Sequence, residues 1–152
     1  MPPIFLDSTD RARFVGGAPG DRLYDIASDM WVLVHDDGTV SIGATSYGVW
    51  LAGEIIGFTA KPRGAVVERG RSLGTVECAK TVIAVHSPLS FTLDAANEAL
   101  EDRAAAINSD PYGSAWMARG RPQDWQRERA LLVDAIAYRA HVLAHDPEAR
   151  FE

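Results

Sequence analysis

The sequence has very little cysteine and no long apolar run. Its 152 residues contain one cysteine, Cys78, which excludes an internal disulfide and a zinc site of several thiolates and is typical of a reducing compartment. No stretch approaches the roughly eighteen apolar residues that a membrane-spanning helix needs. The N-terminal segment 1–7 contains an early acid and too short an apolar stretch for a signal peptide. We therefore expect a cytoplasmic protein without a membrane span.

Positive charge is also scarce. The formal net charge is -6, which argues against nucleic-acid binding, because that function needs a basic face. With 47% hydrophobic and 24% charged residues, the chain is long enough and apolar enough to bury one core. The composition predicts a single soluble domain and leaves open a docking surface for basic partners.

The first half of the chain has the pattern of a β protein. Residues 1–22 mix charges with glycine and proline and have no clear period, so we expect them to form a loosely held N-terminal arm. Short β-rich runs follow from residue 23, and Asp36-Asp37-Gly38 between two of them indicates a tight hairpin. Residues 46–53 predict a helical turn, and further strands are expected at 54–59, 73–85 and 91–93. The predicted fold is mainly β, a small sandwich or flattened barrel.

The sequence pattern changes from β-rich to helix-forming after residue 94. Residues 98–108 are helix-forming and end before Asp110-Pro111. Residues 124–144 predict one long helix, with Leu131, Ala135, Tyr138 and Val142 at helical spacing; Leu132, Ile136 and Leu143 widen this apolar face. We expect the face to pack back onto the β core, the alternative being a helix that binds a partner. The predicted organisation is an N-terminal arm (1–22), a β domain (23–118) and a C-terminal helical extension (119–152).

Lys80 lies in the middle of the apolar run 73–85, which is longer than an ordinary strand. A bend is therefore expected near Lys80, since an unpaired buried charge is costly. The chain contains only two lysines, Lys61 and Lys80, against thirteen arginines. A lysine has a nucleophilic amine that arginine lacks, which makes Lys80 a candidate functional residue.

The chain from about residue 23 to 117 resembles the H protein of the glycine cleavage system, a relative of the lipoyl and biotinyl domains. No single match is specific, but the matches keep their order along the chain, and the lysine precedes a proline by eight residues. They are Trp31-Val32, Ile42-Gly43-Ala44-Thr45, Tyr47, Gly53-Glu54-Ile55, Gly64, Val67, Glu68-Arg69-Gly70, Val76-Glu77-Cys78-Ala79-Lys80, Ser87-Pro88-Leu89, Asn97-Glu98-Ala99-Leu100, Ile107-Asn108 and Asp110-Pro111-Tyr112-Gly113-Ser114-Ala115-Trp116.

This resemblance implies a lipoyl-domain-like flattened barrel or sandwich of two antiparallel sheets, with lipoic acid attached covalently to Lys80 at the tip of a hairpin. Glu77, Cys78 and Ala79 form the context of the lysine, and Glu77 occupies the family's acidic position. The protein would be a non-catalytic carrier with a swinging arm and no metal. Its implied partners are a lipoate ligase or lipoyl transferase, dihydrolipoyl dehydrogenase, and the enzymes that load and unload the arm.

The cargo of the arm is the open question. In glycine cleavage H proteins, acids before the first tryptophan and four residues after the lysine hold a cationic aminomethyl group; Met30 and Ala84 occupy those positions here. Asp29 precedes Met30, but adjacent residues of a strand face opposite sides, so we do not expect it to substitute. The chain also resembles H-like lipoate-binding proteins of bacterial sulfur oxidation, which work with a heterodisulfide-reductase-like complex. We therefore expect a carrier of sulfur intermediates, with the aminomethyl carrier as the alternative and an unmodified structural adaptor as the second alternative.

Other groups of residues give weaker indications of function. In an extended strand Cys78 would share a face with Lys80 and could form a mixed disulfide with a reduced arm, although a lone cysteine is more often a small core residue. His141 and His145 have the helical spacing of a metal pair but lack a third ligand nearby. Ala79 and Thr81 flank the lysine where biotin carriers have methionines. No phosphate loop, nucleophilic triad or pair of catalytic carboxylates is present.

Overall fold

The computed structural model describes residues 12–152. Its strands and helices alternate in short lengths, as the β-rich runs predict. In chain order they are β1 (Val15–Gly16), β2 (Leu23–Asp25), β3 (Met30–Val34), β4 (Val40–Ala44), α2 (Ser46–Ala52), β5 (Ile55–Ala60), β6 (Val66–Val67), β7 (Ser72–Cys78), β8 (Thr81–His86), β9 (Phe91–Ala96), α3 (Glu98–Asp102), α4 (Ala106–Ser109), β10 (Ala118–Pro122), α5 (Trp125–Glu128), the 3-10 turn η1 (Arg129–Leu131), α6 (Ala135–His145) and β11 (Arg150–Phe151).

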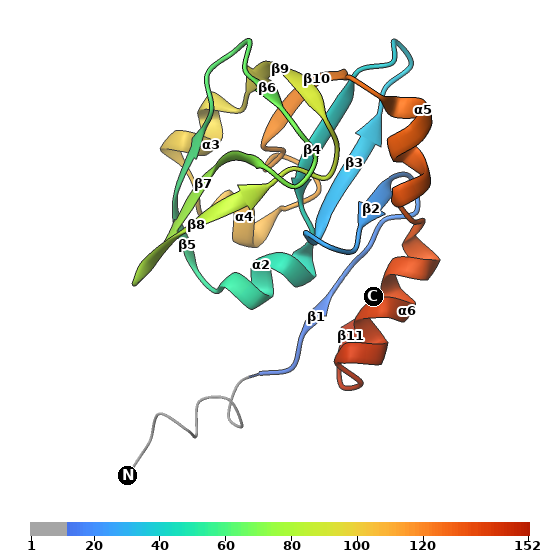
Figure 1. The fold of residues 1–152 in the computed structure, drawn as a ribbon. Coiled ribbons are helices and arrows are strands. Elements are labelled where there is room, and N and C mark those ends of the chain that lie inside the picture. The colour runs from blue at the N-terminus through green and yellow to red at the C-terminus, as the bar shows by residue number, and fades with distance from the viewer. Residues whose placement is uncertain (1–11) are drawn as a thin grey trace.

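Two antiparallel sheets form the body of the molecule (Figure 1). The larger has the strand order β2-β3-β4-β10-β9-β6, and the smaller has the order β5-β7-β8. The principal core, which includes Val32, Ile42, Leu73 and Phe91, draws residues from both sheets. The expected β sandwich of two antiparallel sheets is confirmed. No helix within residues 12–152 is long and apolar enough to span a membrane.

The predicted hairpin at Asp36-Asp37-Gly38 is present between β3 and β4. The His35 amide donates to Thr39 O at 2.8 Å, and Gly38 has the positive φ of 85° that the turn requires. Likewise, the helical turn expected at residues 46–53 is α2, whose N-cap Thr45 accepts a hydrogen bond from Gly48 N. Local turn chemistry was therefore sufficient to predict these features.

A second hydrophobic cluster joins the two ends of the chain. It contains Phe14, Tyr24, Trp31, Tyr138 and Val142, all buried. Phe14 is 2% exposed, and β1 pairs in parallel with β11. The prediction of a loosely held arm is wrong for residues 14–18, and the cause is this contact with the far end of the chain. The part of that prediction that concerns residues 1–11 lies outside the described residues.

The single helix expected at 124–144 is also wrong. The chain forms α5 and η1, becomes extended at residues 132–134 and resumes as α6. The interruption has a clear cause, since Val133 exchanges two backbone hydrogen bonds with Tyr24 of β2, each 2.8 Å long. Asp134 then caps α6 by accepting from Ala137 N. Pairing with the sheet thus overrides helix propensity at this point.

The apolar face predicted for this helix is correct in part. Ala135, Tyr138 and Val142 are buried, and Figure 1 shows α6 beside β2 and β3, so the helix packs back onto the β domain. Ile136, in contrast, is 75% exposed, because it is turned by about 100° per residue away from the buried stripe of Ala135, Tyr138 and Val142. The helix expected at 98–108 is likewise two pieces, α3 and α4, separated where Arg103 adopts a non-helical conformation. The boundaries 1–22, 23–118 and 119–152 stay predictions.

Candidate functional site

Lys80 lies in the two-residue turn between β7 and β8, which confirms the bend expected in this run. The last pair before the turn is Cys78 with Thr81, and both Ala79 and Lys80 are exposed. Figure 1 shows this hairpin projecting from the body of the protein. Among residues 12–152, no hydrogen bond or ion pair involves the Lys80 amine, so it is free to react.

Alternation along β7 explains why the hairpin forms. Gly74, Val76 and Cys78 are buried, whereas Thr75 and Glu77 are exposed, as expected when one face of a strand covers the core. Gly74 lets β5 approach, because a Cβ there would lie 2.4 Å from Thr59 O. The smaller sheet therefore supports the hairpin up to its tip.

The three residues before Lys80 have different surroundings. Glu77 lies over Gly57 of β5, where a Cβ would meet its Oε1 at 3.0 Å. Cys78 is 7% exposed and belongs to the principal core, whereas Lys80 is in the turn. The expectation that Cys78 and Lys80 share a face of an extended strand is therefore wrong, and Cys78 is a small core residue.

A cleft of ≈ 230 Å³ lies beside the hairpin. Strand β8 forms one wall with Ile83, Ala84 and Val85, and residues 27–30 at the start of β3 form part of the lining together with α2. Most of the lining is apolar. Among the residues that line the cleft, Asp29 and His86 are the two with ionisable side chains.

Asp29 lies in the same cleft as Met30 and Ala84. The Asp29 carboxylate accepts from Tyr138 of the second cluster while Met30 packs in the principal core, yet Asp29 also lines the cleft from the turn before β3, where it has a positive φ of 54°. Its amide donates to Asp25 O at 2.9 Å, and its carbonyl accepts from Thr45 N at 3.0 Å. Asparagine and aspartate tolerate this left-handed conformation. Strand alternation does not apply to a residue in such a turn.

The carboxylate of Asp29 is held by the C-terminal helix. The Tyr138 hydroxyl donates to Asp29 Oδ1 at 2.8 Å, and Thr45 Oγ1 lies 2.8 Å from the same hydroxyl. Burial raises the pKa of Asp29, while the hydrogen bond from Tyr138 and the nearby His141 and His145 act in the opposite direction. Burial also raises the pKa of Tyr138, so that its hydroxyl stays a donor. Our sequence analysis placed Tyr138 only in the packing face of a helix.

The two histidines of α6 do not complete a metal site. The rings of His141 and His145 lie 4.4 Å apart, and His145 Nδ1 lies 3.1 Å from the carbonyl oxygen of His141. In the part of the chain that the structure describes, no three histidine, cysteine or acidic side chains are grouped so as to hold a metal ion.

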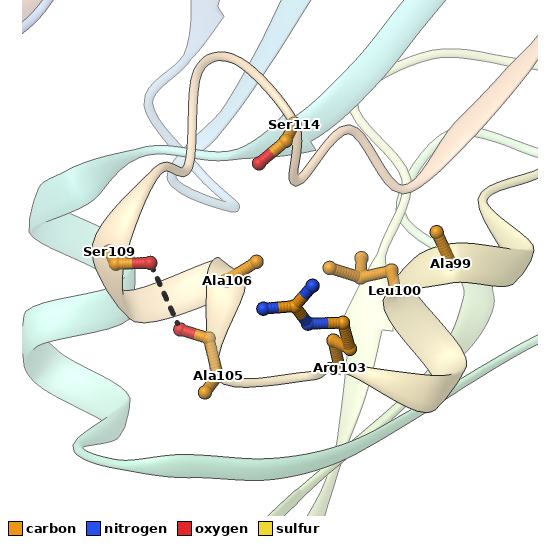
Figure 2. Close-up of a pocket in the computed structure, with 7 residues that line it drawn as sticks. All are labelled: Ala99, Leu100, Arg103, Ala105, Ala106, Ser109 and Ser114. Carbon is orange, nitrogen blue, oxygen red and sulfur yellow. Dashed lines mark hydrogen bonds between the residues drawn. The ribbon is translucent and has the colours of Figure 1, made fainter.

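A second cavity, of ≈ 380 Å³, lies between α3, α4 and the segment near Ser114. Figure 2 shows the Arg103 side chain pointing into it. Its hydroxyls are already engaged, since Ser109 Oγ donates to Ala105 O and Ser114 Oγ donates to Asp110 Oδ2. The lining includes no residue of the lysine hairpin, so this cavity does not contribute to the site.

A free lysine at the tip of a hairpin, an apolar cleft beside it and a two-sheet sandwich define a carrier domain of the lipoyl type. Comparison with known proteins agrees with this class. The family model described as glycine cleavage H-protein matches residues 22–145, and the chain belongs to that family. Proteins of this family are lipoyl carriers and not catalysts, and the same holds for this chain.

Individual relatives support the assignment. The chain is 37% identical over 120 residues to glycine cleavage system H protein 5 of Aquifex aeolicus, covering 77% of this chain and 81% of that one. It is 35% identical over 128 residues to the glycine cleavage system H protein of Marinobacter nauticus, covering 84% and 97%. The crystal structure of a glycine cleavage system H protein from Mycobacterium marinum superposes with a TM-score of 0.72 at 32% identity, covering 82% and 98%. These relatives favour the aminomethyl carrier over the expected sulfur carrier.

Proposed function

We propose that Lys80 is the attachment site of lipoic acid and that the resulting arm carries an aminomethyl group between the glycine cleavage enzymes. Three observations support the attachment: the exposed two-residue turn, the unpaired amine and the neighbouring Glu77, which matches the acidic position of the family. An amide between Lys80 Nζ and the lipoyl carboxyl would remove the positive charge of the lysine. The arm supplies the thiols on which the cargo is carried.

The residues beside the hairpin suit a long apolar arm. Val76, Ile83, Ala84 and Met30 line the cleft, and Ala84 of β8 lies four residues after Lys80, which is in the turn before that strand. At about 3.3 Å per residue the separation is roughly 13 Å, a span comparable to a lysine side chain lengthened by a lipoyl group. These side chains would hold the arm, and Asp29 at the same cleft would face its loaded end.

The observation that carries the proposal for the cargo is the position of Asp29. The resemblance calls for acids near a cationic cargo, and the absence of acids at Met30 and Ala84 was the ground for expecting a sulfur carrier. Asp29 lines the same cleft from the turn before β3, and its carboxylate would face the cation there. A charge-assisted hydrogen bond contributes about 1.5–3 kcal/mol, so one carboxylate is enough to favour a cation there.

The partners follow from this function. A lipoate ligase or lipoyl transferase would modify Lys80, and the decarboxylase, the aminomethyltransferase and dihydrolipoyl dehydrogenase would in turn load, unload and reoxidise the arm. Tethering raises the effective concentration of the cargo at each partner's active site without any new contact. The exposed hairpin leaves the lysine accessible to all of these enzymes.

The attachment site is tested by intact-mass measurement after co-expression with a lipoate ligase and lipoic acid. We expect one lipoyl adduct on the wild-type protein and none on Lys80→Arg. Lys61→Arg is the matched control, because Lys61 is the other lysine of the chain and is also exposed; it should retain the adduct. An unmodified wild-type protein would instead indicate a structural adaptor.

The cargo is tested by reconstitution of the lipoylated protein with purified glycine decarboxylase and labelled glycine. We expect the label to be transferred to the protein and to be lost in Lys80→Arg. A fully lipoylated protein that accepts no label from glycine would contradict the aminomethyl carrier and leave the attachment site intact.

A further inference from the structure

We propose that Tyr138 is a positioning residue for the cargo, because it holds the Asp29 carboxylate at the cleft from the C-terminal helix. This inference rests on the proposed function and deepens it. It also assigns a role to the C-terminal extension: α6 contributes no lining residue to the cleft, but its Tyr138 holds Asp29, which does line it.

The hydrogen bonds that support this role form a chain from α6 to α2. The Tyr138 hydroxyl donates to Asp29 Oδ1 at 2.8 Å, Thr45 donates to the Tyr138 oxygen at 2.8 Å, and Thr45 Oγ1 accepts from Gly48 N at 3.0 Å. Tyr138 and Thr45 are fully buried. The donor geometry is therefore set by packing, and it fixes the direction of the carboxylate.

The backbone around Asp29 is also tightly constrained. A Cβ at Gly48 would lie 2.9 Å from Asp29 Cβ, so α2 can approach this turn only with glycine at that position. The left-handed conformation of Asp29 is fixed further by its two backbone hydrogen bonds. With the backbone held from one side and the carboxylate from the other, the second carboxylate oxygen is free of protein donors among the described residues.

The charged groups around Asp29 come from three elements. Asp25 is the last residue of β2, His141 and His145 lie on α6, and His86 lines the opposite wall of the cleft on β8. Tyr138 makes the direct hydrogen bond, so its hydroxyl is the group whose removal should change Asp29 without changing the charge of the site. Loss of that bond should raise the pKa of Asp29 further, because the bond stabilises the ionised form.

The test compares Tyr138→Phe with Tyr24→Phe. Tyr24 is a matched control, because it is equally buried, stacks on Tyr138 at 4.8 Å, and donates its hydroxyl to Pro19 O and not to Asp29. The carboxyl ¹³C shift of Asp29 is followed against pH in the lipoylated protein. We expect the pKa to rise in Tyr138→Phe and to stay unchanged in Tyr24→Phe. Tyr138→fluorotyrosine, a stronger donor that keeps the ring and the contact, should lower it.

A second readout is retention of the labelled cargo on the loaded protein. We expect the label to be lost roughly tenfold faster in both Tyr138→Phe and Asp29→Asn, which corresponds to one charge-assisted hydrogen bond, and at the wild-type rate in Tyr24→Phe. If Asp29→Asn retains the label like the wild type, the cationic cleft of the proposed function is wrong. If Asp29→Asn loses it faster while Tyr138→Phe retains it with an unchanged Asp29 pKa, only the role of Tyr138 is wrong.

Discussion

The ion pair between Arg69 and Asp25 fixes the loop that presents Asp29. Arg69 Nη2 lies 2.6 Å from Asp25 Oδ1, and Arg69 Nε donates to Pro88 O. Asp25 Oδ2 also accepts from Ser28 at 2.5 Å. These bonds join the loop before β3 to the segment that follows the lysine hairpin. We therefore predict that Arg69→Met destabilises the protein and loosens the cleft.

The magnitude follows from burial. The Asp25 side chain is 4% exposed and that of Arg69 28%, so removal of the arginine leaves a carboxylate with little access to water. Breaking a buried pair in this way costs about 3–5 kcal/mol. We expect the lower end, about 3 kcal/mol, because Ser28 still donates to Asp25 and because Arg69 is partly solvated. Asp25→Asn combined with Arg69→Met should cost less than the sum of the single changes, since the unpaired charge is then absent.

Urea unfolding followed by tryptophan fluorescence measures these free energies. Arg121→Met is the control: Arg121 and Asp94 lie 3.5 Å apart, but their side chains are 68% and 38% exposed, so the change should stay within about 0.5 kcal/mol. The reasoning is refuted if Arg69→Met is as mild as Arg121→Met, or if the double variant shows no coupling.

Two further predictions concern the chain ends and the cleft. Phe14→Ala should lower the free energy of unfolding by about 3–5 kcal/mol, since Phe14 makes edge contacts with three aromatic rings; Val15→Ala, at an exposed neighbour, should have little effect, and equal urea midpoints would contradict the packed arm. We expect the Asp29→Asn variant to gain stability relative to the wild type as pH rises from about 4. The folded pKa of Asp29 is raised, so its contribution is complete below the ordinary pKa and is lost as pH rises through the raised value. Parallel stability curves against pH would exclude this.

The features that sequence predicted correctly are local. Asp36-Asp37-Gly38 specifies its own turn, and the alternation of β7 up to Lys80 indicates a strand that must bend at a charge. In both cases the relevant interactions lie within a few residues of one another, which is why pattern and spacing were sufficient. The role of Lys80 in lipoyl attachment comes from the family resemblance and stays a prediction.

The features that sequence did not predict depend on distant partners. Phe14 lies in a stretch without periodicity and is buried only because β11 and α2 lie beside it. Val133 leaves the helix because Tyr24 of β2 offers two backbone bonds. Asp29 is different, since a local signal was available: Ser28-Asp29 between two β-rich runs is a turn pattern, and it should have taken precedence over strand alternation.

The parallel pairing of β1 with β11 has a consequence for the order of folding. The lysine hairpin closes over two residues and can form as soon as its strands have left the ribosome, whereas the contact of Val15 with Arg150 spans almost the whole chain and must await its end. The hydrogen bond from Tyr138 to Asp29 likewise forms only after α6 has been synthesised. During synthesis, the lysine hairpin can thus form before Asp29 has acquired its partner, and a chain that stops short of α6 would expose Lys80 without the hydrogen bond from Tyr138 to Asp29.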